Sequence, residues 1–263
     1  MGLTIDLKGR TALVTGVSSG IGQGIASMLA KAGCNVSGCG TSASDSAGVR
    51  AFKQKVEENG GKAFYQQVDV TRAEDIEVFV KATAEAFQGI DIVVSNAGKN
   101  VFEGVAECSE EQWQKNLDLN LASHWRVSKY TRPYLEKSSH GVIIIITSNH
   151  AFSTIPGCFP YNITKTALTG LVRSLAIEWG PKVRTVGVAP GFIQTEGNDT
   201  WFNSFPNPEA ERDRTVQLHP VKRLGTVEEV GAFCAFLSSE FAGFVSGSTY
   251  LMDGGRAALM QDS

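Results

Sequence analysis

The chain has 263 residues, 42% of them hydrophobic, and a net charge of −3 with both signs spread along the sequence. This composition is typical of a globular protein with a sizeable core, and the absence of a basic block disfavours nucleic acid or an anionic membrane as a partner. Five cysteines without C-x-x-C spacing argue against a disulfide framework or a zinc site, so we expect no metal. With no signal peptide and no membrane-length apolar run in the sequence, we expect a cytoplasmic protein.

Short apolar, β-branched runs alternate with helix-length amphipathic stretches along the chain. Strands are predicted at 11–15, 35–38, 62–68, 90–95, 142–147, 183–189 and 249–252. Helices are predicted at 21–32, 46–59, 72–87, 109–137, 159–179 and about 226–238. This alternation favours right-handed crossovers and a parallel, doubly wound α/β sheet. No linker or repeat interrupts it, so residues 1–263 are expected to form one domain.

The stretch from about 192 to 222 lacks clear periodicity and carries Trp201, Phe202, Phe205 and three prolines. We expect an irregular segment here. It is either a surface loop with a small core of its own or a lid over a substrate, because long irregular loops in compact domains are often functional.

A glycine-rich turn follows the first strand and leads directly into a helix, in the sequence Thr15-Gly-Val-Ser-Ser-Gly-Ile-Gly22. Gly16 permits a tight turn, Gly20 lets the backbone approach a phosphate, and Gly22 allows close packing of helix on strand. A diphosphate bound there would meet free N–H groups and the positive end of the helix dipole. The turn therefore predicts nucleotide binding, although its spacing is G-x-x-x-G-x-G.

Tyr161 and Lys165 are four residues apart in a predicted helix, thirteen residues after Ser148, which follows an apolar strand. Positions i and i+4 share a helix face, so the Lys165 amine is expected beside the phenol. A tyrosine has a pKa of about 10, and a cation about 5 Å away supplies roughly 3 kcal/mol toward lowering it. Taken alone, the pattern is common on helices, so its meaning depends on the other motifs.

Those motifs, in this order, resemble the short-chain dehydrogenase/reductase family from Gly9 to Gly255. The resemblance rests on 15–22, Asp69-Val70, Asn96-Ala97-Gly98, Asn120, Ser148, Tyr161, Lys165, Pro190-Gly191, Thr195 and Asp253-Gly254-Gly255. It implies an NAD(P)-dependent oxidoreductase on a Rossmann-type seven-stranded sheet of order 3-2-1-4-5-6-7. It also implies that Tyr161 is the general acid/base, that Lys165 lowers its pKa, that Ser148 binds the substrate oxygen and that Asn120 holds a relay water, unless Asn120 is only a surface amide.

The resemblance also implies a set of cofactor contacts. They are Gly16, Ser18, Ser19, Gly20, Ile21, Gly22, Thr41, Ser42, Asp69, Val70, Asn96, Ala97, Gly98, Tyr161, Lys165, Pro190, Gly191, Ile193 and Thr195. Asp69 and Val70 would hold the adenine, and residues 190–195 would hold the nicotinamide amide and diphosphate. Asn96-Ala97-Gly98 and Asp253-Gly254-Gly255 could equally be structural turns.

The end of the second strand bears on the choice between NAD and NADP. Gly40 stands where many NAD-dependent members carry an acid, and Thr41 and Ser42 could donate to a 2′-phosphate, although the arginine frequent in NADP users is missing at Ser19 and Thr41. We expect NADP, with NAD as the alternative.

The substrate is the least determined part. Ser148, His150 and Tyr161 are the expected substrate contacts, although His150 could equally be a packing residue, and Lys99 and Asn100 form either a polar wall or a solvated turn. We expect a secondary alcohol or carbonyl of a polar sugar, polyol or hydroxy acid.

Two alternatives remain open at this stage. One is a 3-oxoacyl thioester reductase, suggested by Arg126 and Arg173 unless these serve a subunit interface; the other, more remote, is a non-catalytic NADP-binding regulator. A homotetramer or homodimer is expected through the 109–137 and 159–179 helices. His124 and Trp125 are expected in intersubunit packing, and whether the tail 256–263 reaches a neighbouring subunit stays open.

Overall fold

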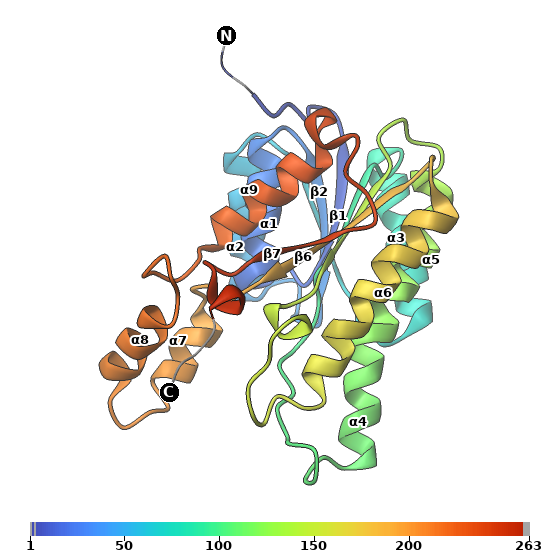
Figure 1. Cartoon of the computed structure of the whole chain (residues 1–263). Coiled ribbons are helices and arrows are strands. Elements are labelled where there is room, and N and C mark those ends of the chain that lie inside the picture. Colours follow the sequence, from blue (N-terminus) through green and yellow to red (C-terminus); the bar gives the residue numbers. More distant parts are fainter. Residues whose placement is uncertain (1, 3, 260–263) are drawn as a thin grey trace.

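The structure is a computed structural model that describes residues 2 and 4–259. Across the described residues, seven parallel strands form one sheet in the order β3-β2-β1-β4-β5-β6-β7, which confirms the expected topology (Figure 1). The strands are β1 (Thr11–Thr15), β2 (Asn35–Gly40), β3 (Ala63–Gln67), β4 (Ile92–Ser95), β5 (Val142–Ile146), β6 (Arg184–Pro190) and β7 (Thr249–Met252).

Helices cover both faces of the sheet (Figure 1). They are α1 (Gly20–Lys31), α2 (Ala47–Glu58), α3 (Ala73–Phe87), α4 (Glu110–Leu117), α5 (Ser123–Leu135), α6 (Tyr161–Trp179), α7 (Glu196–Phe202), α8 (Pro208–Gln217) and α9 (Val227–Ser238). A π-helical turn, η1 (Asp118–Ala122), joins α4 to α5, and 3₁₀ turns occur at η2 (Asn149–Ala151), η3 (Glu240–Ala242) and η4 (Arg256–Ala258).

The core divides into two layers because successive strand residues point to opposite faces of the sheet. In β5, Ile144 packs with the α1, α2 and α9 side chains, whereas Ile143 and Ile145 pack with α3, α5 and α6. All five residues of β5 are buried, as expected of a central parallel strand covered on both sides. The sheet therefore holds the carboxyl ends of its strands along one rigid edge.

Two expectations need correction. The 192–222 segment is not irregular throughout, since it contains α7 and α8, and each begins at a side-chain cap, Thr195 and Asn207. The predicted 109–137 helix is interrupted at Asp118–Ala122, where the backbone adopts the wider π turn. A capping box is present at its start, with the side chains of Ser109 and Gln112 each accepting from the other's backbone N–H.

Every helix within residues 2 and 4–259 is too short or too polar to cross a lipid bilayer. The cysteines are free thiols, four of them buried. Residues 260–263 of the tail lie outside the described range.

Candidate active site

The glycine-rich turn after β1 has the conformation that its sequence predicts. Gly16 and Gly20 have φ values of 76° and 56°, in the left-handed region that favours glycine. Gly22 has no room for a side chain, because a Cβ there would lie 2.0 Å from the Gly16 carbonyl oxygen. Ser19, the N-cap of α1, makes no side-chain capping bond among the described residues, so the first N–H groups of α1 can donate hydrogen bonds to an anion.

Asn96 and Ala97 hold this turn against the end of β4. The Thr15 hydroxyl accepts from both backbone N–H groups at 2.9 Å, and the Asn96 Nδ2 donates to the Thr15 carbonyl at 2.9 Å. A Cβ at Gly16 would lie 3.0 Å from Asn96 Nδ2. These contacts give Asn96 and Ala97 a structural role beside the turn, which is one of the two roles the sequence leaves open.

The end of β2 carries hydroxyl groups where an acid could stand. Gly40 is the last residue of the strand, and a Cβ built on it would lie 3.6 Å from both Ser18 Oγ and Tyr65 OH. The Tyr65 phenol donates to the carbonyl oxygens of Gly40 and Ser42 at 3.1 and 2.7 Å, which fixes the loop that carries Thr41 and Ser42. The last residue of β2 therefore carries no carboxylate and has hydroxyl groups beside it.

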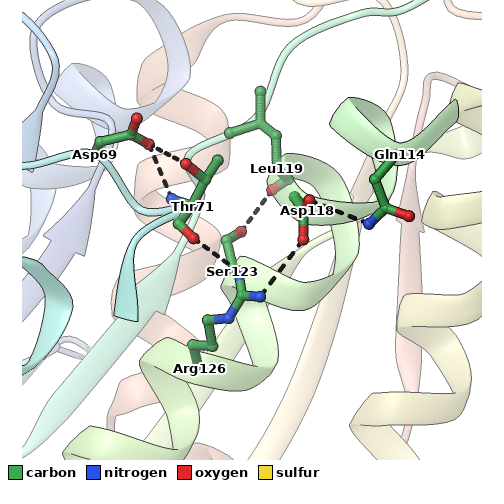
Figure 2. A network of polar contacts seen from close by, with 7 residues as sticks. All are labelled: Asp69, Thr71, Gln114, Asp118, Leu119, Ser123 and Arg126. Atoms are coloured by element: carbon green, nitrogen blue, oxygen red, sulfur yellow. Dashed lines mark hydrogen bonds and ion pairs between the residues drawn. The ribbon is translucent and has the colours of Figure 1, made fainter. Parts of the chain in front are cut away.

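A pocket of about 350 Å³ lies beyond this loop, with Thr41 and Asp69 in its wall. The Asp69 carboxylate accepts from the backbone N–H and the hydroxyl of Thr71 at 2.9 and 2.8 Å (Figure 2). Val70 is 5% exposed and packs in the core. Asp69 therefore lines a pocket, whereas Val70 does not, and an adenine contact stays a prediction for both residues.

Three side chains lie close together where β5 ends and α6 begins: Ser148, Tyr161 and Lys165. The Lys165 ammonium lies 5.5 Å from the centre of the Tyr161 ring, as the i, i+4 spacing predicts, and donates to the Ile146 carbonyl oxygen at 3.1 Å. The Ser148 hydroxyl is close enough to the phenol to lower its pKa. All three side chains are buried, with 3–8% of their surface exposed.

The pKa of the phenol differs from the sequence-based expectation. Burial dominates and raises the pKa of Tyr161 to about 12, against the lowering effect of the Ser148 hydroxyl. Burial also lowers the pKa of Lys165 to about 8, because a desolvated ammonium favours its neutral form. In the chain alone, burial therefore determines the pKa of the phenol, and the lowering of that pKa by Lys165 stays a prediction.

Asn120 lies in the π turn η1 and is fully buried. Its Oδ1 accepts from the Lys99 N–H at 3.0 Å, while its Nδ2 donates to the Lys99 carbonyl oxygen at 2.9 Å and to Asn116 Oδ1 at 2.8 Å. A Cβ at Gly98 would lie 2.8 Å from Asn120 Oδ1 and 3.6 Å from Lys165 Nζ. Asn120 is thus an interior amide beside Lys165, and not a helix-surface residue.

The sequence analysis missed Asn116, which is also fully buried. Its Nδ2 donates to the Pro160 carbonyl oxygen at 3.1 Å, directly before Tyr161. The i, i+4 spacing of two asparagines, Asn116 and Asn120, was the available signal. Together they connect the loop after β4 to the first residue of α6.

Of the remaining substrate candidates, His150 lies beside Tyr161. The His150 ring centre is 6.1 Å from that of Tyr161 and 5.8 Å from that of Phe102. Cys158 Sγ lies 4.0 Å from His150 Nε2. Lys99 and Asn100 are exposed. His150 therefore lies near Tyr161, whereas Lys99 and Asn100 extend toward solvent.

The segment after β6 is ordered by its own side chains. A Cβ at Gly191 would lie 2.6 Å from Asp253 Cβ, and Ile193 is 3% exposed. Thr195 caps α7, and a Cβ at Gly20 would lie 3.5 Å from its Cγ2, which places this segment across from the glycine-rich turn. The aromatic rings of Phe192, Trp201, Phe202 and Phe205 pack together with neighbouring ring centres 4.7–5.6 Å apart.

Two helix residues differ from their expected roles. His124 is fully buried within its own chain, with Nδ1 2.7 Å from Ser95 Oγ, so the expectation that it packs between subunits is wrong. Arg126 is engaged rather than free: it donates to the Thr71 carbonyl oxygen at 2.9 Å and pairs with Asp118 at 3.4 Å (Figure 2). Trp125 is 46% exposed, and its role between subunits stays a prediction.

A doubly wound parallel sheet with a glycine-rich turn after its first strand defines a dinucleotide-binding class of protein. The chain belongs to the short-chain dehydrogenase/reductase family. Residues 16–257 match a family model described as enoyl-(acyl carrier protein) reductase. The family expected from the sequence is therefore confirmed, and with it the use of a nicotinamide cofactor and an alcohol dehydrogenase or carbonyl reductase type of enzyme.

Similar proteins span the whole chain. An uncharacterized oxidoreductase of Thermotoga maritima is 35% identical over 97% of this chain and 100% of its own length. Glucose 1-dehydrogenase 2 of Bacillus subtilis is 34% identical over 95% of each chain. The ligand-free structure of the aldohexose dehydrogenase of Thermoplasma acidophilum superposes with a TM-score of 0.89, at 26% identity over 99% of each chain.

Proposed function

We propose that this protein transfers hydride between NADP and a secondary alcohol or carbonyl group of a polar substrate, with Tyr161, Ser148, Lys165 and Asn120 as its catalytic residues. The observation that supports this most strongly is the convergence of a phenol, a hydroxyl and an ammonium, all buried, at the carboxyl edge of the sheet. The names of the glucose and aldohexose dehydrogenases favour a polyhydroxylated or otherwise polar substrate.

Tyr161 gives its phenolic proton to the carbonyl oxygen in the reductive direction and takes the alcohol proton in the oxidative direction. Ser148 donates to the same oxygen and fixes its approach to the phenol. The high pKa of the phenol keeps the proton on Tyr161 at neutral pH, which suits its role as an acid during reduction. Lys165, with a pKa of about 8, is able to pass a proton onward.

Asn120 has two functions in this proposal. Its side chain fixes the loop of Gly98 and Lys99 beside the Lys165 amine. The π turn interrupts the regular hydrogen-bonding pattern at this position. This supports the proposal that the backbone carbonyl of Asn120 binds a relay water. The proton path is therefore expected to run from Tyr161 past Lys165 toward Asn120.

The residues present fit a dinucleotide. The left-handed glycines and the N-terminus of α1 suit the diphosphate, the pocket at Thr41 and Asp69 suits the adenine, and Pro190 to Thr195 suit the nicotinamide end. When bound, this cofactor supplies or accepts the hydride. Lys165 and Tyr161 can then orient both the cofactor and the substrate.

NADP is favoured over NAD by the chemistry at the end of β2. Gly40 leaves no carboxylate to repel a 2′-phosphate, and the nearby Ser18 hydroxyl, with Thr41 and Ser42, offers hydrogen-bond donors. A second candidate, a reductase of acyl-carrier thioesters, is favoured by the description of the matching family model. It is weakened by Arg126, which is held by Asp118 and Thr71 instead of being free to bind an acidic carrier.

We also infer that residues 192–222 act as a lid and that the protein forms a homotetramer or homodimer. The lid is supported by the position of Thr195 opposite Gly20 and by the aromatic cluster that holds α7. Self-association is supported by large apolar side chains that remain exposed on α5 and α6, with Trp125 at 46% and Ile177 at 81%. Such faces in related folds usually pack against another subunit.

The decisive experiment is a panel of oxo compounds and alcohols assayed with NADPH, NADP, NADH and NAD, read at the nicotinamide absorbance. Tyr161→Phe is expected to lower turnover at least about a thousandfold while the variant still binds NADPH. Tyr134→Phe, on the half-buried side of α5, serves as the matched control and should keep full activity. If Tyr161→Phe retained a tenth of the wild-type rate, Tyr161 would not be the proton donor.

A further inference from the structure

Arg256 lies in the short turn η4 that follows β7. Because the strands are parallel, this turn is at the same edge of the sheet as Ser148, which follows β5. The Asp253 carboxylate holds this turn by accepting from the N–H groups of Gly255 and Ala257 at 3.0 and 2.8 Å. On one side the turn packs against Gly191, whose Cβ would lie 2.7 Å from the Asp253 Cα. On the other, a Cβ at Gly254 would meet Val221 at 2.6 Å, so the backbone of Arg256 is fixed from two directions.

The charge of Arg256 lacks a partner within the part of the chain that the structure describes. The side chain is half-buried, yet the guanidinium makes neither a hydrogen bond nor an ion pair with any of these residues. Both carboxylate oxygens of Asp253 already accept from backbone N–H groups. Burial lowers the pKa of Arg256, and a second cation, Arg214 of α8, lowers it further, while the Asp253 carboxylate raises it without forming an ion pair. A half-buried guanidinium that makes neither a hydrogen bond nor an ion pair with the described residues keeps its donors for an anion that arrives with a ligand.

The Arg256 guanidinium is close to side chains that neighbour Tyr161. Its positive charge lowers the pKa of His150, second to the effect of burial, and it also lowers the pKa of the Cys158 thiol, which burial raises. His150 and Cys158 are 4.0 Å apart, and the His150 ring is edge-on to the Tyr161 ring at 6.1 Å. Arg256 therefore lies within electrostatic range of the two side chains that border the catalytic phenol.

We propose that Arg256 binds the carboxylate of the substrate, so that among polar substrates the enzyme acts on hydroxy acids and the corresponding oxo acids. This inference rests on the proposed function, since it concerns the substrate of the same site. A single planar guanidinium matches a carboxylate with two parallel hydrogen bonds and neutralises one negative charge. His150, on the same side of Tyr161, supplies a further polar contact without adding charge at neutral pH, because its pKa is lowered.

The test uses matched pairs of substrates that differ only in charge: 2-, 3- and 4-oxo acids and their methyl esters, each reduced with NADPH. Wild-type protein is compared with Arg256→Gln, with the conservative variant Arg256→Lys and with Arg50→Gln. Arg50 is an exposed arginine of α2 that donates to the Asp45 carbonyl oxygen, and it serves as the control. Thermal unfolding of each variant checks that the fold is retained.

The expected result is that at least one acid is preferred over its ester by about tenfold or more in kcat/KM. Arg256→Gln should remove this preference by raising the KM for the acid about 10- to 100-fold, while the KM for the ester stays unchanged. Arg256→Lys should restore part of it, and Arg50→Gln should have no effect. The proposal would be overturned by equal use of acids and esters in the wild type, or by an equal loss on both in Arg256→Gln.

A separate measurement distinguishes a failure of this inference from a failure of the proposed function. Calorimetric titration of butyrate and succinate into the protein saturated with NADP needs no turnover. Binding to the wild type that is lost in Arg256→Gln supports the carboxylate site even if none of the oxo compounds is reduced. Absence of such binding, together with reduction of neutral carbonyl compounds, would reject the role of Arg256 while leaving the oxidoreductase function intact.

Discussion

Asn120 and Lys99 exchange two hydrogen bonds, one in each direction: the Asn120 Oδ1 accepts from the Lys99 N–H and its Nδ2 donates to the Lys99 carbonyl oxygen. The buried side-chain amide thus makes the hydrogen bonds that a neighbouring strand would otherwise make to the backbone just after β4. The same amide also donates to Asn116, which holds the residue before Tyr161. The loop after β4 and the start of α6 are therefore mechanically connected through two asparagines.

Asn120→Ala is expected to lower the free energy of unfolding by about 1–3 kcal/mol, because it leaves the Lys99 backbone and the Asn116 amide without partners in the interior. The rate of turnover should fall at least tenfold, since Lys165 lies beside the displaced loop. Denaturant unfolding and steady-state kinetics measure the two effects. Asn100→Ala, at an exposed neighbouring position, is the control, and an Asn120→Ala variant as stable as this control would contradict the prediction.

Lys165→Met should make the protein more stable at pH 7 while abolishing activity. Burial lowers the pKa of Lys165 from 10.5 to about 8, so the unfolded chain binds more protons than the folded chain between these two values. The penalty, about 3 kcal/mol at roughly 1.4 kcal/mol per pKa unit, is fully present below pH 8 and disappears as the pH rises toward 10.5.

The measurement for Lys165 is the difference in unfolding free energy between Lys165→Met and wild type. It should be about 1–3 kcal/mol at pH 7, allowing for the lost bond to Ile146, and should narrow between about pH 8 and 9.5. Groups that titrate alike in both proteins cancel in this difference. A gap that stays constant or widens with pH would show that Lys165 is not destabilised by burial.

Gly40→Asp should shift the cofactor preference from NADP toward NAD by at least about tenfold in the ratio of kcat/KM values. A Cβ at this position has only ordinary contacts, at 3.6 Å, so the aspartate fits without displacing the strand. Its carboxylate would repel a 2′-phosphate and accept a hydrogen bond from a ribose hydroxyl. Gly40→Asn, of the same shape without the charge, is the control; an unchanged preference in Gly40→Asp would remove β2 from the specificity site.

Gly22→Ala and Gly170→Ala form a pair with opposite expected signs. A Cβ at Gly22 would lie 2.0 Å from the Gly16 carbonyl oxygen, and this backbone cannot move without opening the glycine-rich turn. We expect a loss of at least about 1–3 kcal/mol and weaker binding of NADPH. At Gly170, inside α6, an added Cβ would have no described atom within 4 Å apart from its own helix backbone. Alanine should therefore stabilise the helix by about 0.5–1 kcal/mol.

Denaturant unfolding and fluorescence titration with NADPH test this pair. The same substitution with opposite effects at the two sites would separate close packing from general helix propensity. If Gly22→Ala were as stable as wild type and bound NADPH normally, the close approach of α1 to the turn would not be required.

Parts of the fold that the sequence did not predict contain usable signals. Asn207 followed by Pro208 is a helix-start pattern, and Thr195 followed by Glu196 is another, yet the helices they begin are short and largely polar. The π turn had no such signal, because its residues continue the helical pattern of their neighbours on both sides. The sequence shows Arg256 only as a residue of the C-terminal tail. Its neighbours in space are distant along the chain, because they come from α8 and from the loop before α6.

The sequence alone determined the order of strands and helices, the glycine-rich turn and the partnership of Tyr161 with Lys165. These depend on local periodicity, on backbone freedom at glycine and on the i, i+4 geometry of a helix. Only the tertiary structure decided the pKa of Tyr161, the burial of His124, the hydrogen bonds of Arg126 and the surroundings of Arg256. Each of these depends on which distant segments exclude water from a side chain, and burial of that kind leaves no local pattern in the chain.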